Sequence, residues 1–151
     1  MADDTVGPVD AWSTPALLRA ARGIYRAAIR QDLGAAGFGD MPRDGAYVVG
    51  GLARSGAPLS ALIRQMRMSK QAAGQLVDSL VTRGYIDRAV DTDDRRRLTI
   101  SLTDRGQEAA AVVRSAVDRV DTGIVRRVGA DDFAQVRATL VEIVHGDAGP
   151  A

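Results

Sequence analysis

Residues 59–86 read LSALIRQMRMSKQAAGQLVDSLVTRGYI, and apolar side chains recur in them at the three- and four-residue spacing of an α-helix. The first apolar repeat stops at Arg67 and Met68. Ser69 suits the N-cap of a second helix, and Gly84 suits the position just beyond its end. The pattern predicts a helix, a turn and a second helix.

Two short strands and a basic loop are predicted after the helix pair. Residues 86–90 and 98–102 have the apolar alternation of strands, and the loop between them, 91–97, reads DTDDRRR. Arg95, Arg96 and Arg97 give this loop three guanidinium groups. A helix pair followed by a basic hairpin is typical of a winged helix-turn-helix, which holds duplex DNA.

The predicted region before the helix pair contains one long and one short helix. The long helix is expected to be capped by Ser13 or Thr14 and to have Pro15 in its first turn, and Gly34, Gly37 and Gly39 end it. Its apolar residues form one broad face that we expect to be well buried: Leu17, Leu18, Ala21, Ile24, Tyr25, Ala28 and Ile29. Its other face carries a row of arginines, typical of a solvated surface: Arg19, Arg22, Arg26 and Arg30. Pro42 is expected to begin the short helix, and three glycines to form a permissive connection after it: Gly50, Gly51 and Gly56.

Two more helices are predicted at the C-terminal end. Thr103 caps a long helix from about Asp104 to Val128, and Asp131 caps the last helix. The apolar stripe of the long helix extends over about six turns, which a compact winged domain cannot cover alone. We therefore expect the first helix and these two to bury against a second copy of the chain, with Asp118 and Asp121 facing the arginine row. A monomeric helical bundle is the alternative.

Composition narrows the function further. The chain has 151 residues, 46% of them hydrophobic, a net charge of +1, no cysteine and one histidine, His145. These features exclude disulfides and thiolate metal sites, and no set of histidine, cysteine or carboxylates stands at catalytic spacing. We therefore expect no enzyme activity, cofactor or metal. No apolar run reaches the length of a membrane span, and the N-terminus is acidic, so a soluble cytoplasmic protein without a membrane partner is expected.

The second helix of the pair is the predicted recognition helix. Its outward residues are Lys70, Gln71, Gly74, Gln75 and Asp78. Gln71 and Gln75 lie one turn apart, and a glutamine amide pairs with adenine through two hydrogen bonds in the major groove. Ser69 and Lys70 suit phosphates at the helix start. Gly74 costs about 1 kcal/mol relative to alanine in a helix, which indicates either a tight crossing of two helices or close approach to DNA.

Arginines in the hairpin loop suit the minor groove beside the major groove that the helix enters. Arg95, Arg96 and Arg97 are the predicted wing contacts, because narrow A·T stretches of the minor groove attract arginine. The predicted internal partners of these arginines are Asp91, Asp93 and Asp94, and one of the three aspartates holds the loop through a charge-assisted hydrogen bond. The alternative is an exposed tip of mutual ion pairs, which contributes little to stability.

The sequence resembles the MarR family of winged-helix regulators over nearly its whole length. Residues 59–86, the DTDDRRR loop at 91–97 and LTDRG at 102–106 carry the resemblance. It implies a homodimer that places two recognition helices in successive major grooves of a pseudo-palindromic site. It also implies a structural Asp94 and a minor-groove contact by Arg96, although Thr92 replaces a proline that the family often has. Many members are repressors relieved by small, often phenolic, ligands. The absence of cysteine sets this chain apart from the peroxide-sensing members.

The predicted protein is mostly α-helical with a small β-hairpin wing. We expect a lead-in at 1–11, dimerisation helices at 12–40 and 104–146, the winged helix-turn-helix at 41–103 and a tail at 147–151. The predicted function is sequence-specific transcriptional regulation as a homodimeric repressor on double-stranded DNA, with a possible small-molecule effector of unknown identity. The alternative function is a winged-helix module that binds proteins and has lost DNA binding.

Overall fold

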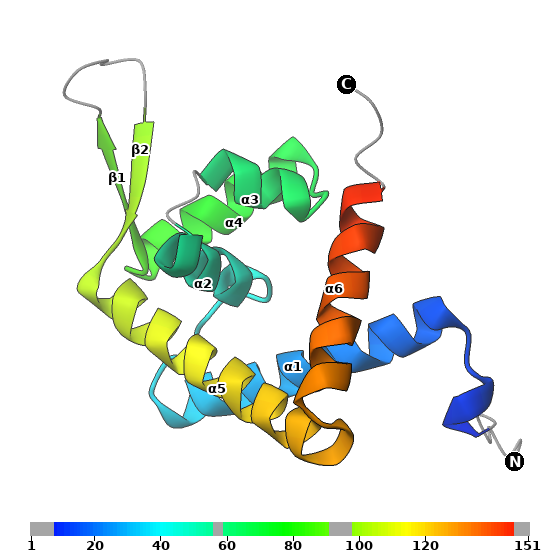
Figure 1. The fold of residues 1–151 in the computed structure, drawn as a ribbon. Helices are drawn as coiled ribbons and strands as arrows, with labels where there is room; N and C mark the ends of the chain where they lie inside the picture. The colour runs from blue at the N-terminus through cyan, green and yellow to red at the C-terminus, as the bar shows by residue number, and fades with distance from the viewer. Residues whose placement is uncertain (1–7, 56–58, 91–97, 147–151) are drawn as a thin grey trace, which may run out of the picture. The chain divides into compact units, whose positions relative to one another are not determined.

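The computed structural model describes residues 8–55, 59–90 and 98–146, and the described chain is mostly helical with one antiparallel pair of strands (Figure 1). This confirms the predicted fold class. After a 3-10 turn at Val9–Ala11, the elements are α1 Thr14–Ala35, α2 Gly45–Ser55, α3 Leu59–Gln65, α4 Lys70–Thr82, β1 Ile86–Val90, β2 Leu98–Leu102, α5 Asp104–Val128 and α6 Ala130–Gly146. They fall into two compact units, Met1–Ala116 and Val117–Ala151.

The hydrophobic core of the first unit joins the helix pair to its neighbours. Apolar side chains from the end of α1, from α2, from α4 and from the first half of α5 meet around Tyr85 and Ile86, which are fully buried at the start of the hairpin. The other core residues are Leu33, Phe38, Val48, Val49, Leu76, Val77, Leu80, Ala109, Ala110 and Val113. Helix α4 is thereby fixed on its inner side.

Local signals set the ends of the helix pair as the sequence predicts. Ser69 caps α4, because its Oγ accepts a hydrogen bond from the Ala72 N–H at 3.1 Å. Arg67 lies in the left-handed region at φ 51°, which turns the chain between α3 and α4. Gly84 has φ 72° just beyond α4, a conformation that favours glycine. The break and the second helix start are therefore confirmed.

The two strands form the predicted hairpin. They pair antiparallel with Ile86 opposite Leu102 and Arg88 opposite Ile100, and they extend away from α2 and α4 (Figure 1). The loop at 91–97 lies outside the described residues, and so do Arg95, Arg96, Arg97 and Asp94. The hairpin is confirmed as a strand pair, and the predicted wing contacts stay predictions.

Two expected helix starts were wrong. The chain turns after Pro42, whose carbonyl accepts the Gly45 N–H at 2.9 Å, and α2 begins at Gly45. α6 begins at Ala130, so that Asp131 lies in its first turn and is not its cap. An acidic side chain there still stabilises the helix through its dipole. The α5 bounds agree with the prediction at both ends.

Gly50 and Gly51 were expected to form a connection after α2. This was wrong, because both glycines lie inside α2. A Cβ atom on Gly50 would lie 3.2 Å from Val113 Cγ1 of α5, and one on Gly51 would lie 2.7 Å from Leu62 Cδ2 of α3. The two glycines therefore let α2 pack closely on its neighbours. Gly56 lies outside the described residues.

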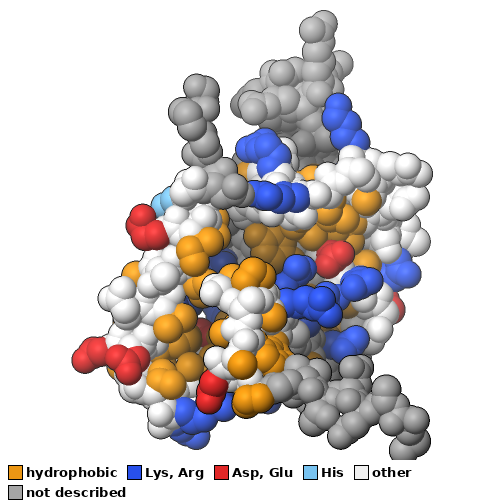
Figure 2. Space-filling view, turned by 90° about the vertical axis from the view of Figure 1, so that its right-hand side faces the viewer, with side chains coloured by type: hydrophobic (Ala, Val, Ile, Leu, Met, Phe, Trp, Pro, Cys, Tyr) orange, Lys and Arg blue, Asp and Glu red, His pale blue; other side chains and the backbone are white. Residues whose placement is uncertain are grey.

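The outer helices leave apolar side chains in solvent (Figure 2). Within the first unit, α1 buries Leu33 but exposes Leu17, Leu18 and Ile24, the last by 60%, so the expected burial of this face is not found within this unit. In the second unit, α6 has no buried residue, and its exposed apolar residues are Val136, Leu140, Val141, Ile143 and Val144. None of the described helices has both the length and the apolar character that a membrane crossing requires.

Candidate nucleic-acid interface

Helix α4 separates its side chains into two faces. Ala73, Leu76, Val77 and Leu80 are buried in the core. The opposite face is exposed and consists of Lys70, Gln71, Gly74, Gln75 and Asp78. The structure therefore brings the five residues that the sequence predicts as outward-facing onto one surface, which we call the α4 outer face.

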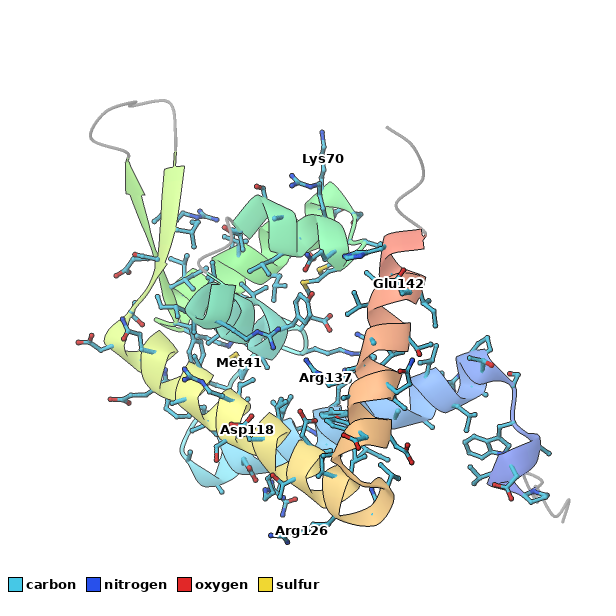
Figure 3. All side chains as sticks on the ribbon, viewed as in Figure 1. Met41, Lys70, Asp118, Arg126, Arg137 and Glu142 are labelled. Carbon is cyan, nitrogen blue, oxygen red and sulfur yellow. The ribbon has the colours of Figure 1, made fainter. Side chains whose placement is uncertain are left out.

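The N-terminus of α4 is open to solvent. Ser69 and Lys70 are both exposed there, and Figure 3 shows the Lys70 side chain extending away from the helices. The Ser69 hydroxyl oxygen caps the Ala72 N–H, while the other amides of the first turn lack helical partners. A lysine beside the positive end of a helix dipole suits a phosphate group.

An ion pair joins the α4 outer face to the hairpin. Arg88 Nη2 of β1 donates to Asp78 Oδ1 at 2.5 Å, and both side chains are well exposed. The sequence indicated that Asp78 points outward but gave no sign of a partner ten residues further along the chain. Arg88 is therefore a basic residue near the α4 outer face that the sequence reasoning missed.

A second polar cluster lies at the base of the hairpin. The Tyr85 hydroxyl donates to Asp40 Oδ1 at 2.6 Å, and Arg105 Nη2 donates to the same oxygen at 2.8 Å. The Arg105 guanidinium stacks 4.7 Å from the Tyr85 ring centroid and 5.5 Å from that of Phe38. Asp40, Tyr85 and Arg105, which we call the hairpin-base cluster, join the segment before α2, the start of β1 and the first turn of α5.

The hairpin-base cluster changes the ionisation of its members. The hydrogen bond from Tyr85, together with the charge of Arg105, lowers the pKa of the Asp40 carboxyl. Burial of the phenol, followed by its hydrogen bond to Asp40, raises the pKa of Tyr85. Both shifts keep a neutral phenol donating to a charged carboxylate near neutral pH.

The LTDRG segment has a structural explanation at the same place. The Thr103 hydroxyl donates to the Gly84 carbonyl at 2.5 Å and accepts the Gly106 N–H at 3.0 Å, which caps α5 on the end of the helix pair. A Cβ on Gly106 would lie 2.0 Å from the Tyr85 carbonyl oxygen, so only glycine fits. Thr103, Arg105 and Gly106 therefore all connect α5 to the start of β1.

Gly74 meets no other part of the described chain. A Cβ atom built on it has no neighbour within 4 Å. The tight helix crossing that was one explanation for this glycine is therefore not found among the described residues.

Tyr47 and the single histidine, His145, lie on other helices. Tyr47 is half exposed and its hydroxyl donates to Gln65 Oε1 at 2.9 Å, which joins α2 to α3. His145 is exposed in the last turn of α6. Among the described residues, no group of three histidine, cysteine or acidic side chains is placed to hold a metal ion.

Comparison with known proteins gives a family match over part of the chain and similar folds over most of it. Residues 40–97 match the MarR family. S. aureus MepR in its DNA-binding conformation superposes with a TM-score of 0.72 at 20% identity, over 89% of this chain and 98% of MepR. MepR in its complex with DNA gives a TM-score of 0.70 over the same shares. NadR in complex with 4-hydroxyphenylacetate gives 0.71 at 19% identity, over 91% of this chain and 96% of NadR. No curated protein sequence matches the chain.

Proposed function

We propose that this chain is a MarR-family winged helix-turn-helix protein and that it regulates transcription by binding a specific DNA sequence with the α4 outer face. The observation that carries the proposal is the composition of that face. Residues Lys70, Gln71 and Gln75 are exposed on a helix whose other side is locked into the core. A helix held in this way presents its side chains at fixed positions, which reading a base sequence requires.

Each side chain of the proposed interface has a different role. Gln71 and Gln75 bind adenine edges in the major groove, and Ser69 and Lys70 bind phosphates at the helix start. The wing arginines Arg95, Arg96 and Arg97 enter the adjacent minor groove, with Asp94 holding the loop. In this assignment, residues 41–103 bind DNA, and 12–40 and 104–146 form the dimer, between a lead-in at 1–11 and a tail at 147–151.

We propose a homodimer as the DNA-binding form. The apolar side chains that α1 and α6 expose support this, because neither helix is covered by its own unit. A symmetric dimer presents two α4 helices to two half-sites about one helical turn apart, which implies a pseudo-palindromic operator.

A repressor is the mode of regulation that we propose. A dimer seated on DNA blocks access to a promoter that overlaps its site, without any enzymatic step. NadR has been seen with 4-hydroxyphenylacetate, which supports a small organic effector as a way to change the spacing of the two α4 helices. Its chemical identity in this protein is left open.

Fluorescence anisotropy tests the proposal directly. The full-length protein is titrated against the DNA upstream of its own gene, against duplexes it selects from a random pool, and against scrambled duplexes, at several salt concentrations. We expect tight binding to a selected sequence that weakens as salt rises, because neutralised phosphates release counterions. Equal, weak binding to every duplex would contradict the proposal and favour the protein-binding alternative.

Single substitutions then test whether residues of the α4 outer face contact DNA. Gln71→Ala and Gln75→Ala should each weaken binding to the selected duplex by about tenfold or more, since a bidentate base contact is worth about 1–3 kcal/mol. Lys70→Ala should weaken binding to the selected duplex and to the scrambled duplex by similar factors. Gln31→Ala, an exposed glutamine on α1, is the matched control and should leave binding unchanged.

A further inference from the structure

Gly74 stands at the centre of the α4 outer face. Lys70 and Gln71 lie one turn before it, and Gln75 and Asp78 follow it, all of them exposed. It is in the interior of a 13-residue helix that ends at Thr82. A side chain on residue 74 would therefore project from the middle of the surface that we assign to DNA.

No contact within the described chain explains this glycine. A Cβ atom on Gly74 has nothing within 4 Å, whereas one on Gly106 or Gly51 would collide with a neighbouring element. Its φ is not among the positive values, which occur at Gly37, Gly84 and Gly129. Neither packing nor backbone conformation requires glycine here, although glycine destabilises a helix relative to alanine.

The side chains around Gly74 need a short distance to the bases. The α4 outer face has no arginine, and its proposed base readers, Gln71 and Gln75, are glutamines. A glutamine amide carbon is two bonds closer to the backbone than the guanidinium carbon of an arginine. For both amides to reach adenine edges, the helix backbone must lie close to the floor of the major groove, where thymine methyl groups also project.

We propose that Gly74 determines specificity by letting the backbone of α4 approach the bases closely enough for Gln71 and Gln75 to read them. This rests on the proposed function. A methyl group at position 74 holds the helix away from the groove floor and so weakens base contacts made by its neighbours. The same methyl group stabilises the free protein, because it meets no steric obstacle and improves helix propensity.

The proposal predicts effects of opposite sign on stability and on binding. Gly74→Ala should raise the Tm of the free protein by about 2–4 °C. It should weaken binding to the duplex selected by the wild-type protein by about tenfold, and Gly74→Leu should weaken it further. Binding of both variants to a scrambled duplex should stay within about twofold of wild type, because phosphate contacts supply it.

Gly34→Ala is the matched control. Gly34 is an exposed helical glycine on α1 whose Cβ would also have nothing within 4 Å. Gly34 lies in the range that we assign to the dimer, so sedimentation first confirms that Gly34→Ala stays dimeric. Its replacement should then raise Tm without changing DNA affinity. The assays are thermal unfolding by circular dichroism and anisotropy titrations with both duplexes.

Three results would overturn the proposal. If Gly74→Ala and Gly74→Leu bind the selected duplex as tightly as wild type, Gly74 does not set the approach, while the proposed function stands. If they lose affinity equally for the selected and scrambled duplexes, the loss does not come from base contacts. If the wild-type protein selects no sequence at all, the proposed function fails and this inference with it.

Discussion

Gly106→Ala should be strongly destabilising, because the structure leaves no room for a Cβ at this position. That atom would lie 2.0 Å from the Tyr85 carbonyl oxygen, 3.0 Å from the Tyr85 carbonyl carbon and 3.1 Å from Leu102 Cδ2. The nearest atoms are backbone, so they cannot rotate away. The first turn of α5 and the start of β1 must separate by about 1 Å or more to remove the overlap.

That separation affects three hydrogen bonds. Thr103 N–H donates to the Tyr85 carbonyl at 3.2 Å, the Thr103 hydroxyl donates to the Gly84 carbonyl, and Gly106 N–H donates to the Thr103 hydroxyl. Each contributes about 1 kcal/mol, and forcing apart a packed contact costs about 1–3 kcal/mol. Alanine has a higher helix propensity than glycine, which offsets about 1 kcal/mol of this loss in unfolding free energy. The expected loss is therefore about 3–5 kcal/mol, or a Tm lower by about 10 °C or more.

Urea and thermal unfolding of the wild type, Gly106→Ala and Gly34→Ala measure this difference. Gly34→Ala makes the same chemical change at an open helical position and should be slightly stabilising. A Gly106→Ala protein within about 1 kcal/mol of wild type would refute the reasoning. It would mean that α5 and β1 can separate at the LTDRG segment without loss.

Three further predictions concern charge and assembly. Stability should fall below about pH 4, because the unfolded chain then protonates the Asp40 carboxyl, whose pKa folding lowers. It should also fall above about pH 10, because the unfolded chain then ionises the Tyr85 phenol, whose pKa folding raises; Tyr85→Phe should flatten this alkaline fall in a plot of urea midpoint against pH. Asp78→Asn should change the unfolding free energy by less than about 1 kcal/mol, because its ion pair with Arg88 is exposed. It should also steepen the slope of the logarithm of the DNA-binding constant against the logarithm of the salt concentration by about one, because Arg88 is then free to contact a phosphate. An unchanged slope would exclude Arg88 from the interface. Val144→Asp, at a residue 70% exposed on α6, should shift sedimentation from dimer to monomer, and a wild-type protein that already sediments as a monomer would contradict the dimer.

The elements that the sequence predicts correctly have local causes. Ser69 begins α4 because its own side chain caps the helix, and Gly84 follows the helix because its φ is positive. Thr103 likewise begins α5 with a bond to an amide three residues away. Signals of this kind lie within a few residues of the structure that they determine, so the sequence alone contains them.

The features that the sequence does not reveal depend on distant partners. Gly50 and Gly51 suggest a turn by residue type, but they lie inside α2, where side chains of α3 and α5 pack closely on them. The contact between Asp40 and Arg105 spans 65 residues, which no local pattern encodes. The apolar face of α1 was recognised, but its periodicity cannot say whether the covering surface belongs to the same chain.

The start of β1 connects the parts of the proposed interface that must keep a fixed separation. Arg88 joins β1 to α4 through Asp78, and Tyr85 joins it to the segment before α2 and to α5 through Asp40 and Arg105. A helix in the major groove and a wing in the minor groove can bind together only if their spacing matches that of the duplex. In the proposed function, the hairpin-base cluster and the Arg88–Asp78 ion pair are the contacts that would hold the two elements at that spacing.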